Sequence, residues 1–156
     1  MGVILLFSEI INSPDIQNKN SVLVGGSFDV LHSGHITFLR NAKKQGTTLI
    51  VLLESDTAIR QKKGVHRPIS SQQERAFVLS ELQSVDSIVL MPEETHDSDY
   101  YEVTKAIKPA IIATTKGDPY REQKIVCANA IQAMVIDVTP RIDKKSTSRI
   151  VKLLKK

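Results

Sequence analysis

The order of apolar and polar residues predicts alternating strands and helices from about residue 21 to the end of the chain. The apolar run at 22–24 and the β-branched run at 48–53 are typical of parallel strands that are buried on both faces. Segments with apolar residues at helical spacing lie between such runs. The predicted strands are 22–24, 48–53, 87–90, 111–113 and 134–138, and the predicted helices are 36 to a stop at Gly46, 71–82, 98–107, 118–132 and 146–154.

Two of the predicted helices carry further local signals. In the second one, Phe77, Val78 and Leu82 have the spacing of a single buried face. Asp118 followed by Pro119 is a strong helix start, because a carboxylate can cap the free N–H groups and proline fits the first helical turn. We therefore expect one helix to bury its aromatic side and another to begin at this Asp-Pro pair.

Strands that alternate with helices predict an α/β fold, in which crossover helices cover both faces of a parallel sheet. We expect a single doubly wound, Rossmann-like domain over 21–156, preceded by a lead-in segment at 1–20 with a short helix at 3–11. In such folds the ligand site lies beyond the carboxyl ends of the strands. The predicted loops at that edge are 25–35, 54–68, 91–97, 114–118 and 139–147.

Composition and charge narrow the class of protein. The chain has 156 residues, which suits one domain, and its 21 basic and 17 acidic side chains give a net charge of +4. This charge suits an anionic substrate. The 4% aromatic content and the lack of a basic recognition helix argue against nucleic acid. The single cysteine, Cys127, excludes an intrachain disulfide and a cysteine-cluster metal site. We expect a cytoplasmic protein without a membrane segment, because no apolar run is long enough and the start is unlike a signal peptide.

The loop after the first predicted strand carries the most specific motif, Gly25-Gly26-Ser27-Phe28-Asp29-Val30-Leu31-His32-Ser33-Gly34-His35. Its first two glycines let the backbone approach a ligand closely. His32 and His35 are three residues apart where a helix begins, so both imidazoles can face the same point. A helix N-terminus attracts anions, and two histidines without a third ligand in register make a poor zinc site. The motif therefore favours a phosphate site.

Two other segments offer groups for anion binding. Lys62, Lys63 and Arg67 form a basic stretch at the predicted site edge, where they could neutralise a triphosphate, although solvated basic loops are common. Three hydroxyl residues at 146–148 begin the last predicted helix, either as an ordinary cap or as a second anion site.

The segment 26–29 followed by His32-Ser33-Gly34-His35 resembles the signature of the cytidylyltransferase-like nucleotidyltransferases, and the likeness extends from about Ser21 to the C-terminus. Within that superfamily the chain is most similar to the heptose 1-phosphate adenylyltransferase domain of ADP-heptose synthesis. The supporting segments are 54–56, 62–64, 67–69, 74–76, 85–86, 116–118 and 146–148. This resemblance implies transfer of a nucleoside monophosphate, from ATP rather than CTP, to a small phosphorylated sugar, with release of pyrophosphate. It also implies Mg²⁺ bound with the triphosphate through phosphate oxygens, and a homodimer.

The motif and the resemblance together assign roles to individual residues. The predicted catalytic residues are His32, His35, Lys63 and Arg75. The two histidines are expected at the α- and β-phosphates in the transition state, and the lysine and the arginine at the leaving pyrophosphate. Asp56 and Arg67 are predicted to bind the acceptor, and no dedicated carboxylate cage for a metal is predicted. The predicted nucleotide-binding residues are Gly26, Ser27, Phe28, Asp29, Gly34, Lys116, Gly117, Asp118, Ser146, Thr147 and Ser148.

Three functions fit these residues. The first is an adenylyltransferase of the heptose-phosphate type. The second is a relative with another base or acceptor, such as a glycerol 3-phosphate cytidylyltransferase or an FAD synthase of the archaeal type. The third is a nucleotide-binding module without catalysis, against which the intact His32, Gly34, His35, Lys63 and Arg75 argue.

Overall fold

A computed structural model describes residues 1–13, 19–140 and 147–154, and in these ranges the chain forms six strands and seven helices. The strands are β1 (Val3–Leu6), β2 (Ser21–Gly26), β3 (Thr48–Leu53), β4 (Ser87–Leu90), β5 (Ile111–Thr115) and β6 (Met134–Thr139). The helices are α1 (Phe7–Asn12), α2 (Ser33–Lys43), α3 (Asp56–Lys63), α4 (Gln72–Ser80), α5 (Asp97–Ile107), α6 (Arg121–Ile131) and α7 (Thr147–Leu154). Among the described residues, no helix is both long enough and apolar enough to cross a bilayer.

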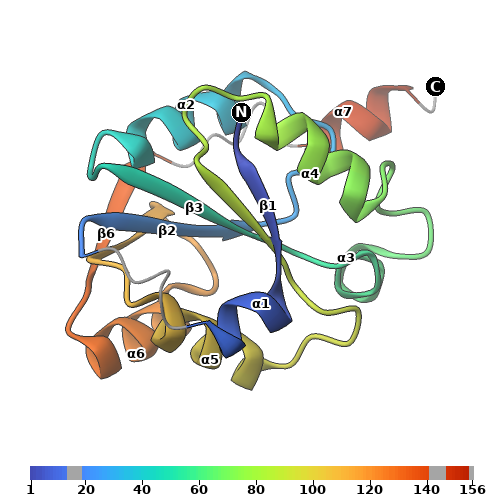
Figure 1. The fold of residues 1–156 in the computed structure, drawn as a ribbon. Helices are drawn as coiled ribbons and strands as arrows, with labels where there is room; N and C mark the ends of the chain where they lie inside the picture. Colours follow the sequence, from blue (N-terminus) through green and yellow to red (C-terminus); the bar gives the residue numbers. More distant parts are fainter. Residues whose placement is uncertain (14–18, 141–146, 155–156) are drawn as a thin grey trace.

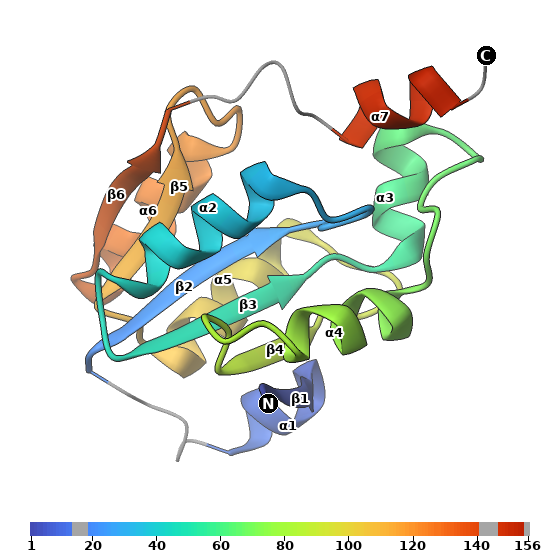
Figure 2. The same cartoon turned by 90° about the horizontal axis from the view of Figure 1, so that it is seen from above.

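The strands form one parallel sheet in the order β1-β4-β3-β2-β5-β6. Helices α2 and α4 cover one face of the sheet, and α1, α5 and α6 cover the other (Figure 1). Seen from above, α3 and α7 lie beyond the tips of the β2 and β3 arrows (Figure 2). The predicted doubly wound, Rossmann-like α/β architecture is therefore confirmed.

Two apolar cores, one on each face, hold the sheet between its helices. Successive residues of a strand point to opposite faces, so Val22 and Val24 of β2 enter the core beneath α2 and α4, whereas Leu23 enters the other. Leu39 of α2 is fully buried in the first core, and Ile107 of α5 is fully buried in the second. This two-sided burial explains why the central strands are continuous apolar runs.

The order of the strands fixes where a ligand can bind. Strand β2 lies between β3 and β5, so the chain moves outward from β2 in one direction through β3 and β4 and then returns to β2's other side at β5. At such a reversal the loops after the two adjacent strands diverge and leave a crevice at the carboxyl edge of the sheet. The histidine motif follows β2 directly, at this position.

The lead-in segment differs from the prediction. Instead of one helix over 3–11, residues 3–6 form the edge strand β1, and a helix follows at Phe7–Asn12. Val3 and Leu6 are paired in register with the ends of β4, and Ile10 of α1 is buried in the second core. The apolar run of Val3–Leu6 therefore pairs with a strand that lies about 80 residues later in the chain, which local periodicity does not reveal.

Two further boundaries differ from those predicted. The segment 54–68, expected as a loop, contains α3, whose first turn is capped by the Ser55 hydroxyl accepting from the Ala58 N–H at 3.1 Å. Helix α6 begins at Arg121 rather than at the Asp-Pro pair. The Asp118 carboxylate instead accepts from the Tyr120 N–H at 2.8 Å, which makes a turn that leads into the helix.

Candidate nucleotide site

The two histidines of the motif lie face to face at the start of α2. His32 is the N-cap residue, and its Nδ1 accepts a hydrogen bond from the Gly34 N–H at 3.1 Å. The rings of His32 and His35 are stacked, with centroids 3.9 Å apart and planes inclined by 26°. The expectation that both imidazoles share one location is therefore met, and the N-terminal end of α2 adds its dipole there.

Phe28 supports this pair from behind. Its buried ring meets the His35 ring edge to face at a centroid distance of 5.4 Å. A side chain at Gly26 would come within 3.0 Å of the same ring, so the glycine makes room for it. Phe28 and Val30 both adopt positive φ angles, 44° and 57°, which are uncommon for residues with large side chains. The loop is thus held in a strained shape that packs Phe28 under the histidine. The predicted nucleotide contact of Phe28 remains a prediction.

Burial and neighbouring positive groups keep His35 uncharged at neutral pH. Burial is the largest cause that lowers its pKa, followed by the proximity of His32 and Lys63, and the result is a pKa of about 4. Asp29 acts in the opposite direction but does not outweigh these effects. The Nδ1 atom of His35 is buried and has no hydrogen-bond partner among the described residues. A neutral imidazole with an unused polar atom is suited to bind a ligand through a hydrogen bond.

Asp29 does not face the site openly but anchors the loop. Its carboxylate is fully buried and accepts from Arg67 Nε at 2.7 Å and from the Ile69 N–H at 3.0 Å, with a longer bond from the Ser70 N–H. Arg67 is itself only 7% exposed. This buried ion pair ties the loop after β2 to the segment between α3 and α4. The predicted nucleotide contact of Asp29 and acceptor contact of Arg67 remain predictions.

Lys63, at the end of α3, reaches the same loop. Its Nζ donates to the Ser27 hydroxyl at 3.1 Å. Partial loss of hydration beside this loop lowers the pKa of Lys63, and the nearby Arg67 charge lowers it further. Ser27, Lys63 and the histidines thus share one edge of the sheet, as the sequence predicted.

Arg75 occupies a buried position on α4 and is bound on all three guanidinium nitrogens. Its Nε donates to the Ser70 carbonyl at 3.1 Å, and one Nη donates to the Ser27 carbonyl at 2.6 Å. The other donates to the Glu54 carbonyl at 2.9 Å and to the Asp56 carboxylate at 2.7 Å. The residue therefore joins the loops after β2 and β3, and Asp56 serves as its partner. Their predicted contacts with phosphate and acceptor remain predictions.

The loop after β5 holds a second cluster of polar residues. Gly117 has a φ of 79°, which a glycine adopts without strain. The Asp118 carboxylate accepts from Thr114 Oγ1 and from Lys124 Nζ, each at 2.5 Å. Burial alone would raise the pKa of Asp118, but these hydrogen bonds outweigh it and lower the pKa. Lys116 donates its N–H to the Thr139 carbonyl at 3.0 Å. The role of this loop in nucleotide binding is not tested by these contacts.

The last predicted anion group falls largely outside the described residues. Ser146 lies outside them, and the structure describes the backbone of Thr147 and Ser148 only, at the first turn of α7. The predicted helix is confirmed, and the proposed contacts of its three hydroxyl residues stay predictions.

Sequence reasoning named Lys62 and the segment 54–56 but missed the contacts that join Lys62 and Glu54 to Tyr100 and Tyr120, between α3 and the loop after β5. Lys62 Nζ donates to the Glu54 carboxylate at 2.8 Å and lies 4.9 Å above the centre of the Tyr120 ring. Tyr100 of α5 is close enough to this group for the Glu54 charge to contribute, after burial, to a raised pKa. No short-range pattern links these residues, because they come from four different elements.

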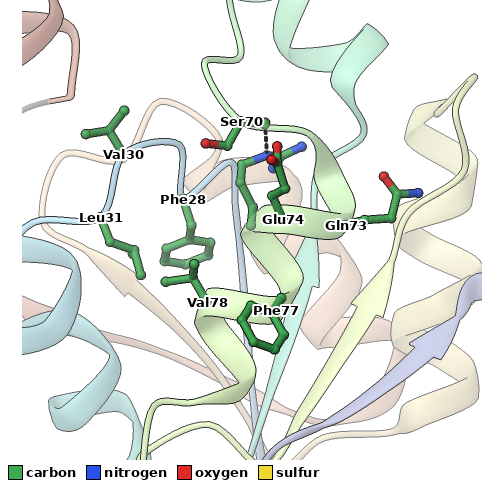
Figure 3. Close-up of a pocket in the computed structure, with 9 residues that line it drawn as sticks. Phe28, Val30, Leu31, Ser70, Gln73, Glu74, Phe77 and Val78 are labelled. Atoms are coloured by element: carbon green, nitrogen blue, oxygen red, sulfur yellow. Dashed lines mark hydrogen bonds between the residues drawn. The ribbon is translucent and has the colours of Figure 1, made fainter.

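A groove of about 560 Å³ lies beside this site, between the loop after β2 and α4, and Phe28 and Arg75 are among its lining residues. Figure 3 shows Phe28 and Leu31 on one side of the groove and Phe77 and Val78 of α4 on the other. Phe77 is 61% exposed, so the prediction that it and Val78 form the buried face of this helix was wrong. The buried residues of α4 are Gln72, Arg75, Ala76, Leu79 and Ser80.

Hydrogen bonds explain why α4 is turned in this way. Gln72 donates from its side-chain amide to the carbonyls of Leu53 at 2.9 Å and Met91 at 3.0 Å, which lie at the ends of neighbouring strands. Arg75 satisfies the three carbonyls described above. Buried carbonyls without partners are costly, so Gln72 and Arg75 face inward beside the apolar Leu79, and the side with Phe77 faces out.

The described residues include no group of three or more histidine, cysteine, aspartate or glutamate side chains that could hold a metal ion. The expected arrangement, in which Mg²⁺ arrives with the nucleotide and binds mainly to phosphate oxygens, remains a prediction.

Comparison with known proteins agrees with this geometry. A family model described as cytidylyltransferase-like matches residues 23–153. The chain belongs to the cytidylyltransferase-like family. The match includes the histidine loop, α3, α4 and the loop after β5, and it leaves out β1 and α1.

The family relatives include longer proteins. The bifunctional protein HldE of Wolinella succinogenes is 38% identical over 136 residues, which cover 87% of this chain and 27% of the relative. That of Campylobacter curvus is 39% identical over 137 residues, covering 88% of this chain and 28% of the relative. The chain thus spans less than a third of the length of these relatives.

Solved structures agree on the fold. The lipopolysaccharide core biosynthesis protein from Thermoplasma volcanium superposes with a TM-score of 0.63 at 29% identity, covering 83% of this chain and all of that one. Pantothenate synthetase from Thermus thermophilus superposes with a TM-score of 0.64 at 14% identity, covering 97% of this chain and 67% of that one. The second match shows the fold alone.

Proposed function

We propose that this chain transfers a nucleoside monophosphate, from ATP in preference to CTP, to a phosphorylated sugar of the heptose 1-phosphate type and releases pyrophosphate. The observation that carries the proposal is the stacked pair of His32 and His35 at the N-terminus of α2, directly after the central strand β2. Family membership supports nucleotidyl transfer. The HldE relatives, together with the sequence resemblance, favour the heptose-phosphate acceptor.

The reaction needs charge stabilisation more than proton transfer. The acceptor phosphate is a nucleophile without a general base, and the difficulty is bringing two polyanions together at the α-phosphorus. A His35 that is neutral can donate a hydrogen bond to a phosphate oxygen, while the N–H groups at the start of α2 attract the same charge. Lys63 lies beside Ser27, where a cation can hold the departing pyrophosphate. A magnesium ion bound to the triphosphate would neutralise further charge.

We infer a supporting part for Arg75 in this reaction. In the unliganded arrangement its guanidinium already makes four hydrogen bonds, which join the loops that carry Ser27 and Asp56. Such a group fixes the position of the loops around the triphosphate. Direct contact with phosphate, which the family resemblance implies, can use the fifth N–H of the guanidinium, on the nitrogen that donates to the Ser27 carbonyl.

A cytidylyltransferase is the second candidate, since the matching family model is described by that activity. An assay of pyrophosphate release with ATP and with CTP, each against a panel of sugar phosphates, polyol phosphates and FMN, separates the two. We expect release with ATP and a sugar phosphate. Release with CTP alone would show that the chain is a cytidylyltransferase. Release with FMN as the acceptor would indicate an FAD synthase. Release with no pair would favour a module that binds nucleotides without catalysis.

Replacement of His35 tests the site itself. His35→Ala should lower kcat by at least about 100-fold, because it removes a hydrogen bond to the charge that develops in the transition state. Nucleotide affinity should change less than kcat. His66→Ala is the matched control, since that histidine is exposed on the chain after α3 and should leave kcat unchanged. A folded His35→Ala protein with the wild-type kcat would overturn the assignment.

A further inference from the structure

Arg67 has a donor atom that the folded chain does not use. Among the described residues, the buried side-chain polar atoms without a hydrogen-bond partner are His35 Nδ1, Thr139 Oγ1 and Arg67 Nη2. Only the arginine atom carries part of a permanent positive charge. An unsatisfied buried donor of a charged group costs at least about 1–3 kcal/mol, so an arginine held in this state calls for a ligand or another explanation.

The arginine is held rigidly while this atom stays unused. Its Nε donates to the fully buried carboxylate of Asp29 at 2.7 Å, and that carboxylate is in turn fixed by the main-chain N–H groups of Ile69 and Ser70. A buried carboxylate bound from three sides cannot move to serve the second nitrogen. The guanidinium is therefore oriented before any ligand arrives, which reduces the entropy lost on binding.

The groups that surround Arg67 are suited to bind a phosphate. Asp29, to which it is bound, is two residues from Ser27, and the Ser27 hydroxyl is bound to Lys63 Nζ at 3.1 Å. Lys63 lies close enough to both residues for their charges to act on it: Arg67 lowers the pKa of Lys63, and Asp29 raises it. With Lys62 and Glu54, whose charges also act on Lys63, three cations and two carboxylates leave an excess positive charge beside the loop that carries the histidine pair. Arginine binds phosphate oxygens through such planar donors.

We propose that Arg67 Nη2 donates a hydrogen bond to a triphosphate oxygen of the bound nucleotide, beside Lys63 and Ser27, while Nε remains on Asp29. This deepens the proposed function and rests on it. It assigns Arg67 to the nucleotide instead of the acceptor, and it leaves Arg75 as the group that fixes the surrounding loops.

The test uses inorganic tripolyphosphate and ATP, each with Mg²⁺, as calorimetric ligands of the whole chain. Arg67→Lys keeps a cation for Asp29 but removes the planar second donor, so Kd for both ligands should rise about tenfold or more. Arg60→Lys, on the exposed side of α3, is the matched control and should bind like the wild type. Thermal unfolding of both variants shows whether they remain folded. Equal binding by folded Arg67→Lys and wild type would overturn the inference.

A second measurement does not depend on the variant folding. In a crystal structure of the wild-type chain with a non-hydrolysable ATP analogue, Arg67 Nη2 should lie at a hydrogen-bond distance of about 3 Å from a phosphate oxygen. A separation above about 4 Å, with the analogue bound at the histidine pair, would overturn the inference and leave the proposed function intact. If the wild type binds neither tripolyphosphate nor ATP, the proposed function fails as well.

Discussion

Two buried arginines, Arg67 and Arg75, lie at the carboxyl edge of the sheet, and they show different ways of using a guanidinium. Both are nearly inaccessible, at 7% and 3% exposure, and each binds a carboxylate at 2.7 Å. Both also tie the loop after β2 to the segment around the start of α4. By burial and by ion pairing alone, the two residues would be given the same role.

Their hydrogen bonds separate them. Arg75 donates to three main-chain carbonyls as well as to Asp56, whereas Arg67 donates to Asp29 and keeps Nη2 without a partner among the described residues. A guanidinium with a hydrogen bond on each of its three nitrogens organises the structure. One with a buried and unused nitrogen is suited to receive an anion. A full account of donors and acceptors therefore distinguishes the two roles where burial does not.

The largest change in stability should follow from replacing the carboxylates that the two arginines bind. Asp29→Asn should lower the free energy of unfolding by about 3–5 kcal/mol, because it leaves the Arg67 charge buried without its counterion. Asp56→Asn should cost about 1 kcal/mol, since the Asp56 side chain is 25% exposed and three carbonyls still bind Arg75. Urea unfolding of the two variants and the wild type measures both.

The two variants are each other's control, since both replace a carboxylate by an amide of the same shape beside a buried arginine. Equal losses of unfolding free energy would contradict the distinction drawn between the two arginines. A loss below about 1 kcal/mol for Asp29→Asn would show that the buried pair contributes little beyond a neutral hydrogen bond.

The next effect concerns pH and His35, which packs against the loop that Asp29 holds. The pKa of His35 is about 4 in the folded chain and 6.5 ordinarily, so the unfolded chain takes up a proton first as the pH falls. The His35 contribution to stability is therefore complete above pH 6.5 and is lost between pH 6.5 and about 4, by up to about 3 kcal/mol.

Unfolding curves at several pH values, for the wild type and for His35→Gln, measure this contribution. The difference in unfolding free energy between the two proteins should shrink as the pH falls through that range. If this difference in unfolding free energy does not depend on pH, the pKa of His35 in the folded chain is close to its ordinary value.

The same residues show how far the sequence could predict the structure. The central strands and most helices were predicted correctly, because a strand buried on both faces has a continuous apolar run. The location of the histidine pair was also predicted, since it follows directly from its place after β2. The buried link between Asp29 and Arg67 could not be, because it joins residues 38 positions apart through a bond that leaves no local pattern.

Helix α4 shows where periodicity fails. The spacing of its apolar residues predicted that Phe77 and Val78 would be buried, and both are exposed. Gln72 and Arg75 face inward instead, because the carbonyls at the strand ends need donors. The same face carries Ala76 and Leu79, which are buried in the first core, so it combines apolar packing with hydrogen bonds to the strand ends. The spacing of apolar residues therefore identifies the core-facing side of a helix only where that side does not also have to supply hydrogen-bond donors.

The smallest effect should come from this outer face of α4. Phe77→Ser should change the free energy of unfolding by no more than about 0.5 kcal/mol, because the ring is 61% exposed and serine and phenylalanine have similar helix propensities. Leu79→Ala, two residues further on and fully buried, is the contrasting variant and should cost about 2–5 kcal/mol. Urea unfolding at two protein concentrations measures both variants. If Phe77→Ser costs as much as Leu79→Ala, and if the wild-type midpoint rises with concentration, a second copy of the chain covers this face, and Arg75 then lies between the nucleotide site and a subunit contact.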